Sequence, residues 1–130
     1  MESNERLIEA ARKAREHAYA PFSNFKVGAA VRSRSGRVSS GCNIENASYG
    51  LTLCAERVAI FKAMSEGERE FDAIAVVTDA DQLTPPCGAC RQIIWEMCGN
   101  VEVVLANLKV QRKTHRMKDL LPLPFDAHSL

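Results

Sequence analysis

Three cysteines and one glutamate are the residues of this chain whose types and spacing could support a chemical reaction. Glu56 follows Cys54 by two residues, and Cys87 and Cys90 stand three residues apart. Cysteine thiolates are preferred zinc ligands, and a carboxylate beside the metal can move protons. Three ligands leave a fourth coordination position open, where bound water becomes nucleophilic near neutral pH. The residue types and their spacing therefore predict a catalytic zinc site.

Two helix starts must bring these side chains together. Residues three apart on a helix share one face, so Cys87 and Cys90 can point at one ion, and Cys54 must supply the third ligand. Pro86 suits the first turn of a helix, where its missing N–H costs nothing. Unpaired amides and the positive end of the helix dipole favour thiolate over thiol. We therefore expect both helix starts to face the same metal.

The residue types and their spacing also allow other interpretations. A Cys-x-x-Cys pair is also typical of structural zinc knuckles and of redox pairs. A structural site would need a fourth protein ligand, and the histidines are distant in sequence, although distance in sequence does not exclude them in space: His17, His115 and His128. Glu56 could instead cap its helix by accepting hydrogen bonds from backbone N–H groups.

The first third of the chain predicts a helix followed by a hairpin. Apolar residues recur at helical spacing from Ser3 to Ala20, and Pro21 forbids continuation of that helix. Residues 26–32 and 38–44 flank a short polar connection that contains glycine, which is typical of a β-hairpin.

The second half predicts the order helix, strand, helix, strand. The helix that starts at Cys54 ends at Gly67, and residues 71–78 contain an apolar run suited to a strand covered on both faces. A helix from about Cys87 to Cys98 then leads to a strand over residues 101–106. A strand, helix, strand sequence implies a parallel, right-handed crossover. We expect an α/β fold with a mixed sheet, in one domain spanning residues 1–130.

Size and charge restrict the classes of partner. A chain of 130 residues can bury a core without help from a metal. With 17 basic and 16 acidic residues, it has no overall field that would recruit nucleic acid or an anionic membrane. It has no apolar run long enough to span a bilayer, and residues 1–6 lack the apolar core of a signal peptide. We expect a cytoplasmic protein whose five cysteines bind metal or lie buried.

The motifs resemble those of a known enzyme family. Cys-Ala-Glu at 54–56, followed by Pro-Cys-Gly-Ala-Cys at 86–90, resembles the three-cysteine form of the zinc nucleoside and nucleobase deaminase signature. Segments 19–30, 41–50 and 120–125 resemble the small tetrameric cytidine deaminases, and only residues 107–119 match poorly. The resemblance implies three α/β/α layers, with about five strands in the sheet and helices on both faces.

The resemblance also implies roles for individual residues. Cys54, Cys87 and Cys90 would bind one zinc ion per subunit, and Glu56 would pass a proton from the bound water to N3 and then to the leaving amine of cytosine. The implied substrate contacts are Phe25, Asn43, Glu45, Ala47, Tyr49, Ala55 and Phe125, with Tyr49 and Phe125 approaching the site of a neighbouring subunit. Arg57 would hydrogen-bond the ligand sulfurs, and Gln92 would play a similar supporting role.

Several of these residues can also be interpreted without the resemblance. Asn43 and Glu45 alternate along an extended segment, so both could offer polar groups to vicinal hydroxyls, or both could be solvated loop residues. Phe25 could stack on a base or belong to the core. Arg57 could offset the negative charge of three thiolates or simply face solvent.

A basic stretch between residues 109 and 118 departs from the family pattern. Its members are Lys109, Arg112, Lys113, His115, Arg116 and Lys118. Such a run is typical of a solvated face, but phosphate contacts would keep a nucleotide or RNA substrate possible. Glu45 would repel a nearby phosphate, so we do not expect nucleic acid as a partner.

The function that the sequence predicts is hydrolytic deamination of cytidine and 2′-deoxycytidine to the uridine products and ammonia, a reaction of pyrimidine salvage. The expected enzyme is a zinc-dependent homotetramer whose active sites are shared between subunits. Alternatives are a deaminase of a cytosine-containing antibiotic nucleoside or of a nucleotide, and a zinc-binding module without catalysis.

Overall fold

A mixed five-stranded sheet, with strand order β2-β1-β3-β4-β5, forms the centre of the protein. The computed structural model describes residues 3–109 and 111–130. The strands are β1 (Val27–Ser33), β2 (Val38–Cys42), β3 (Phe71–Thr78), β4 (Glu102–Asn107) and β5 (Arg112–Arg116). β3 and β4 pair in parallel, and the other neighbouring strands are antiparallel. The predicted mixed sheet and parallel crossover are confirmed.

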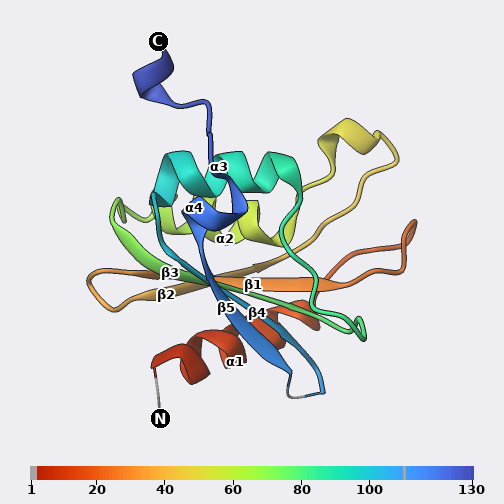
Figure 1. Cartoon of the computed structure of the whole chain (residues 1–130). Coiled ribbons are helices and arrows are strands. Elements are labelled where there is room, and N and C mark those ends of the chain that lie inside the picture. Colours follow the sequence, from red (N-terminus) through yellow and green to blue (C-terminus); the bar gives the residue numbers. More distant parts are fainter. Residues whose placement is uncertain (1–2, 110) are drawn as a thin grey trace.

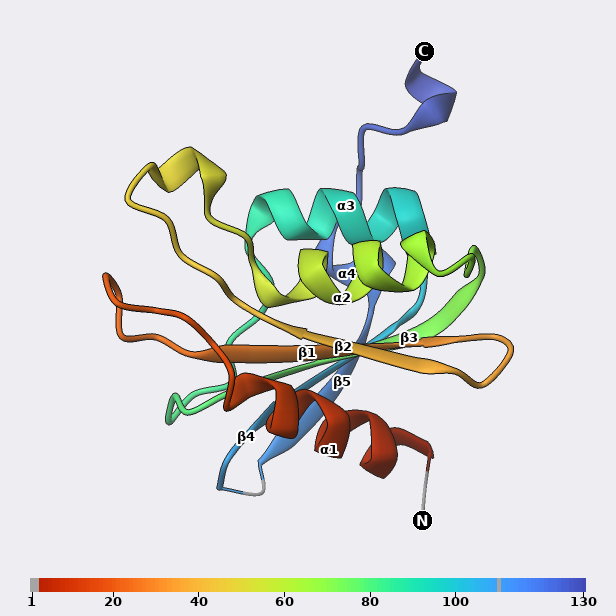
Figure 2. The ribbon, with the colours of Figure 1, turned by 180° about the vertical axis from the view of Figure 1, so that it is seen from behind.

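Helices cover both faces of this sheet. α1 (Ser3–Arg15) lies on one face, whereas α2 (Ala55–Ser65) and α3 (Gly88–Cys98) lie side by side on the other (Figures 1 and 2). Three short elements complete the described chain: η1 (Tyr49–Leu51), α4 (Met117–Leu120) and η2 (Ala127–Ser129). The expected α/β/α arrangement is therefore present. Within residues 3–109 and 111–130, no helix has the length and apolar character needed to cross a membrane.

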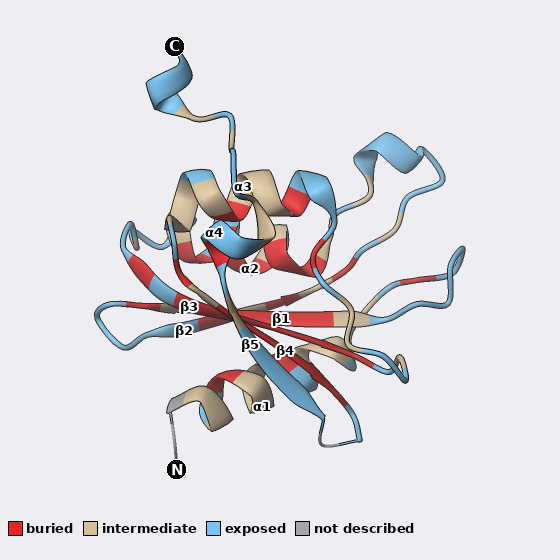
Figure 3. Cartoon of the chain, in the orientation of Figure 1, coloured by how far each residue is buried: buried red, intermediate tan, exposed pale blue. Residues whose placement is uncertain are grey.

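β3 is buried on both faces, and this explains its continuous apolar sequence. Ile74 and Val76 pack in the cluster beneath α2 and α3, whereas Ala75 and Val77 pack in the cluster on the α1 face. Figure 3 shows the buried residues concentrated along the sheet and on the helix faces turned toward it. The strand that leads to the cysteine-containing turn is thus held from both sides.

The first helix is shorter than the sequence predicts. It ends at Arg15 rather than at Ala20. The residues that follow are drawn toward another segment, because the N–H of Tyr19 donates to the carbonyl of Asn43 and the N–H of Glu45 donates to the carbonyl of Tyr19. These tertiary hydrogen bonds replace the last helical turn, and they hold the segment that contains Asn43 and Glu45 beside the end of α1.

Two glycines let the helices approach the hairpin closely. A Cβ atom at Gly28 would lie 2.0 Å from the carbonyl oxygen of Ala11 in α1, and one at Gly41 would lie 2.7 Å from the backbone nitrogen of Ala59 in α2. Both distances are too short for a real Cβ contact. The close packing of α2 on β2 fixes the start of that helix, where Cys54 is located.

Candidate active site

The three predicted zinc ligands lie together. The Sγ atoms of Cys54, Cys87 and Cys90 are all within 4.8 Å of one another. Cys54 is the residue that precedes α2, and Cys87 is the residue that precedes α3. Zinc–sulfur bonds are about 2.3 Å long, so the cluster is compact enough for one ion. Within the described residues, this is the one group of three or more such side chains close enough to hold a metal.

The electrostatics of the cluster also fit a cation. The Cys54 thiol has its pKa lowered to about 5, chiefly by a hydrogen bond from Cys90 and further by Arg57, with burial acting in the opposite direction. Cys90 has its pKa raised, because it donates to Cys54 and because it is buried. Cys54 and Cys90 therefore compete for a proton, and both would ionise only with a positive charge beside them. A divalent zinc ion supplies that charge, so this donor set suits it.

Glu56 is buried beside the cysteines, with an exposed fraction of only 5%. Its carboxyl pKa is raised to about 7, first by burial and then by the negative charge of Cys54. A carboxyl group with a pKa near neutrality can both accept and donate protons under physiological conditions. The side chain of Glu56 lines the same cavity as Cys54 and Cys87.

Two arginines form hydrogen bonds with the turns that contain Cys54 and Cys87. Arg57 donates from Nη2 to the sulfur of Cys54 at 3.3 Å, while its Nε is buried and no described group accepts from it. Arg91 donates to the carbonyl of Pro86 at 2.8 Å and to that of Leu120 at 2.9 Å. Sequence reasoning assigned no role to Arg91, since only tertiary structure brings Leu120 to it.

A cavity of about 300 Å³ opens beside the cysteine cluster. Its lining includes five of the predicted site residues besides Cys54 and Cys87: Phe25, Asn43, Glu45, Ala55 and Glu56. Sequence reasoning did not single out eight further lining residues: Ser23, Val27, Thr52, Leu53, Val76, Thr78, Thr84 and Pro85. Thr78 ends a strand of the parallel pair, and ligands of α/β proteins bind at such carboxyl ends, so this signal could have identified it.

Asn43 is buried and organises the wall that contains Phe25. Its Oδ1 accepts from the N–H of Val27 at 2.9 Å, and its Nδ2 donates to the carbonyl of Phe25 at 2.8 Å. An amide side chain can make further hydrogen bonds, so one N–H and one lone pair remain for another partner. Asn43 therefore fixes the backbone on both sides of residue 26 while still facing the cavity.

Glu45 is held by the loop that precedes β1. Its carboxylate accepts hydrogen bonds from the N–H groups of Phe22 and Ser23 and from the hydroxyl of Ser23. The hydroxyl of Ser23 lowers the pKa of Glu45 most, and the two backbone donors lower it further. The group therefore stays negatively charged at neutral pH, which favours neutral hydroxyl partners over phosphate.

Four predicted substrate-contact or supporting residues do not line this cavity. Tyr49 is 76% exposed, contacts Phe22 edge-to-face and lines a neighbouring hollow, whereas Ala47 lines neither space. Phe125 is exposed, and its carbonyl accepts a hydrogen bond from Gln92. The contact found for Gln92 is thus with the C-terminal segment rather than with a cysteine sulfur. The roles predicted for these four residues, like the roles predicted for the residues that line the cavity, remain predictions.

The basic stretch forms the edge strand β5 and the turns beside it. Three of its cations have protein partners: Arg112 pairs with Glu5, Lys109 pairs with Asp81, and Arg116 donates to the carbonyl of Asn100. Its members lie mainly at the surface and do not line the main cavity.

Comparisons with known proteins agree with this geometry. Residues 1–107 match the family described as the cytidine and deoxycytidylate deaminase zinc-binding region. The chain is 52% identical over 125 residues to a cytidine deaminase of Halalkalibacterium halodurans, with 95% of each chain covered. It is 50% identical over 127 residues to a cytidine deaminase of Sporosarcina psychrophila, with 97% of this chain and 93% of the relative covered.

A solved structure matches the fold over almost the whole chain. The crystal structure of a cytidine deaminase from Burkholderia pseudomallei superposes with a TM-score of 0.90 at 52% sequence identity. The match covers 93% of this chain and 98% of the other. The arrangement of sheet and helices described above is therefore the arrangement of that protein.

Proposed function

This chain belongs to the cytidine and deoxycytidylate deaminase family of zinc-binding proteins, and from that premise we propose that it hydrolyses cytidine and 2′-deoxycytidine to the uridine products and ammonia. The observation that carries the proposal is the composition of one cavity. Cys54, Cys87 and Glu56 line it together with Asn43 and Glu45, so groups suited to reaction and groups suited to sugar binding face the same space.

The three cysteines would hold the zinc ion. When bound, zinc would supply Lewis acidity, which lowers the pKa of a water ligand toward 7. Arg57 donates to the sulfur of Cys54, so it offsets part of the negative charge that three thiolates place around the metal.

Glu56 would carry the proton. Its carboxylate accepts a proton from water, donates it to N3 of the cytosine ring, and later delivers a proton to the departing amine. Burial keeps its pKa near neutrality, which makes both directions of transfer accessible. Overall, water is consumed, the C4–N4 bond of cytosine breaks, and ammonia leaves.

The opposite wall would select the nucleoside. Phe25 packs on the pyrimidine, and the free hydrogen-bonding capacity of Asn43 and the carboxylate of Glu45 bind the ribose hydroxyls. A charged Glu45 disfavours a 5′-phosphate nearby, which argues for a nucleoside over a nucleotide.

We also propose that copies of this chain assemble into an oligomer. The C-terminal segment leaves the body beyond α4 (Figures 1 and 2), and it carries the exposed apolar side chains of Leu123 and Phe125. Tyr49 and Leu51 are exposed on a loop at another edge of the protein. Apolar side chains displayed in this way are suited to an interface between copies. A homotetramer in which Tyr49 and Phe125 complete neighbouring sites would account for them.

One assay tests the reaction. Zinc-loaded protein is incubated separately with cytidine, 2′-deoxycytidine, cytosine, cytidine monophosphate and a cytosine-containing antibiotic nucleoside, and ammonia is measured. We expect release from the first two and little from the others. Turnover confined to the nucleotide, the free base or the antibiotic would contradict the proposed substrate. Absence of turnover throughout, with four protein ligands on the metal, would identify a non-catalytic zinc module.

A further inference from the structure

Asn107 stands at the end of β4, directly beside the end of β3. It is the register partner of Thr78, and only 7% of its surface is exposed. Adjacent parallel strands bring their carboxyl ends to one edge of the sheet, where α/β proteins form their sites. Asn107 does not line the main cavity, and nothing in the proposed reaction uses it. A buried polar side chain at this position therefore needs a structural explanation.

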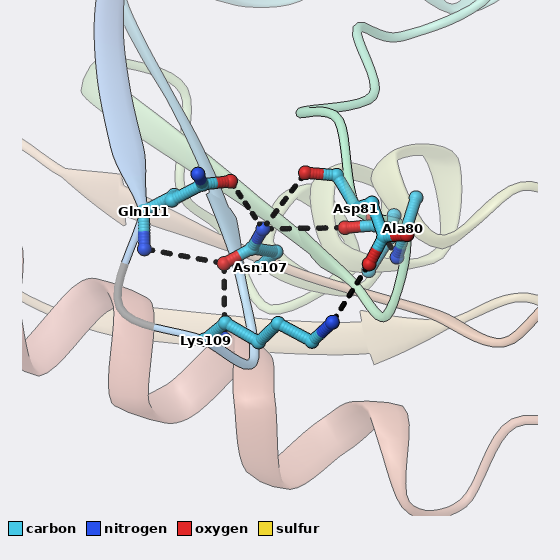
Figure 4. A network of polar contacts seen from close by, with 6 residues as sticks. Ala80, Asp81, Asn107, Lys109 and Gln111 are labelled. Carbon is cyan, nitrogen blue, oxygen red and sulfur yellow. Dashed lines mark hydrogen bonds and ion pairs between the residues drawn. The ribbon is translucent and has the colours of Figure 1, made fainter.

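The amide of Asn107 joins two chain segments (Figure 4). Its Nδ2 donates to the carbonyl oxygens of Ala80 and Asp81, at 3.2 and 3.5 Å, and to Oε1 of Gln111 at 2.9 Å. Its Oδ1 accepts from the N–H groups of Lys109 and Gln111, at 3.0 and 3.2 Å. The donor side thus contacts the loop after β3 and also Gln111, whereas the acceptor side contacts Lys109 and Gln111, which follow β4.

The loop that Asn107 holds leads to the cysteine cluster. The N–H of Ala80 donates to the hydroxyl of Thr78, and that hydroxyl is also hydrogen-bonded to the hydroxyl of Thr84. Thr84 and Pro85 line the main cavity, and the ligand Cys87 follows two residues after Pro85. A displacement at Ala80 would therefore reach Thr84 in the cavity wall through the hydroxyl of Thr78, and the metal ligand Cys87 follows three residues after Thr84.

The first part of this loop has little other support. In the described part of the chain, residues 80–85 make no backbone-to-backbone hydrogen bond. Lys109 forms an ion pair with Asp81 at 2.7 Å, but both side chains are exposed. Exposed ion pairs contribute little to stability. The buried amide of Asn107 is therefore the main polar restraint on Ala80 and Asp81.

We propose that Asn107 is a positioning residue for the active site: its amide donors hold the loop after β3 so that Thr84 and Pro85 form the cavity wall and Cys87 keeps its place in the zinc site. This inference rests on the proposed function for its substrate, but its effect on the loop and on metal retention can be measured independently of turnover.

The test compares three variants of the full-length, zinc-loaded protein. Asn107→Asp keeps the shape and the acceptor but removes both amide donors. Asn107→Ala removes the donors without burying a charge. Lys109→Ala removes the exposed ion pair to the same loop and is the matched control. The measurements are amide hydrogen exchange at Ala80 and in β1, the rate of zinc transfer to a chelator, and KM and kcat for cytidine.

In both Asn107 variants, we expect faster exchange of the Ala80 amide, which is bonded to the hydroxyl of Thr78, together with zinc release accelerated about tenfold and a KM raised by a similar factor. Exchange in β1 should be unchanged in both Asn107 variants. The Lys109→Ala protein should resemble the unmodified protein in all three measurements. The inference is overturned if Asn107→Ala folds with unchanged loop exchange and zinc release, or if Lys109→Ala reproduces the Asn107 effects. Loss of β1 protection in both Asn107 variants would also overturn it, because the residue would then support the whole fold. If the unmodified protein lacks turnover, the proposed function fails, but exchange and zinc release still decide the role of Asn107.

Discussion

Glu56 combines burial with the nearby negative charge of Cys54, and both raise the proton affinity of its carboxylate. Its neighbour Arg57 acts in the opposite direction on Cys54, whose thiolate it stabilises by a hydrogen bond. Two nearby residues therefore have opposite pKa shifts. The lowered pKa of the Cys54 thiol suits it to hold a cation, and the raised pKa of the Glu56 carboxyl suits it to exchange protons near neutral pH.

Replacing Glu56 with Gln tests whether this residue transfers protons without binding the metal. The amide preserves the shape of the side chain but cannot accept a proton, so we expect kcat to fall by at least about 10²-fold. The zinc content should stay the same, because the three cysteines are unchanged. Zinc is measured by atomic absorption and turnover by ammonia release. Full turnover in this variant, or loss of zinc from it, would contradict the proposed role.

At the level of elements, the two ligand-bearing helices are positioned by close packing and by the strands. α2 lies against β2 because Gly41 has no side chain, and α1 lies against β1 for the same reason at Gly28. α3 begins where the loop after β3 ends, so the parallel pair β3–β4 sets the position of Cys87. The site thus depends on contacts made far from the cavity.

Adding a methyl group at these contacts should separate a helix from the sheet. We expect Gly28→Ala to destabilise the protein by about 3 kcal/mol, because the new Cβ meets the backbone of α1 and backbone cannot easily move aside. Gly50→Ala is the control, since a Cβ there meets nothing within 4 Å; its effect should stay within about 0.5 kcal/mol. Urea unfolding measures both. Equal midpoints for the two variants would contradict the packing argument.

The C-terminal segment is attached to α3 through a titratable contact. The indole N–H of Trp95 donates to the carboxylate of Asp126 at 3.0 Å, and this hydrogen bond is the largest contribution to the lowered pKa of Asp126. A lowered carboxyl pKa means that the contact stabilises the attached segment at neutral pH and is lost as the pH falls through that lowered value. The attachment should therefore persist to a pH below 3.8, the ordinary value for this group.

Trp95 is the single tryptophan of the chain and reports on this attachment. We expect its fluorescence to change in a step below pH 3.8. Asp126→Asn should lack that step, because an amide does not titrate in this range. Far-UV circular dichroism recorded in parallel distinguishes detachment of the segment from general unfolding. The same step at the same pH in the Asn variant would show that another group is responsible.

For the molecule as a whole, the distribution of the predicted substrate contacts is the notable property. Five of the predicted residues line one cavity with Cys54 and Cys87, whereas Tyr49 and Phe125 are exposed and do not line it within one chain. A single copy therefore leaves these aromatic side chains without the function that the sequence predicts for them. Assembly into the proposed homotetramer would bring both side chains to the site of a neighbouring subunit.

Mixed oligomers can test whether sites are shared. Glu56→Gln lacks the proposed proton carrier but has an intact C-terminal segment, whereas Phe125→Ala has the reverse defect. If Phe125 completes a neighbouring site, refolding the two variants together should give more ammonia release than the sum of the separate proteins, because some sites combine an intact Glu56 with an intact Phe125. Sedimentation confirms assembly. Activity equal to the sum, or a monomer with full turnover, would contradict the shared site.

The sequence alone determined the local chemistry of this protein and most of its elements. Short-range patterns were sufficient for the hairpin, the apolar strand β3, the parallel crossover and the helix starts at Cys54 and Cys87, because periodicity and capping act over a few residues. The spacing of the three cysteines also indicated one metal, since residues three apart share a helix face.

Tertiary structure alone decided what long-range contacts control. α1 ends at Arg15 because Tyr19 pairs with the segment around Ile44, and no local pattern encodes that partner. The buried environment that raises the pKa of Glu56 and the contact of Asn107 with Ala80 likewise arise from segments distant in sequence. Burial and hydrogen-bond partners depend on which segments meet in space, so spacing along the chain indicated the candidate reacting groups but not the surroundings that shift their pKa values and hold them in place.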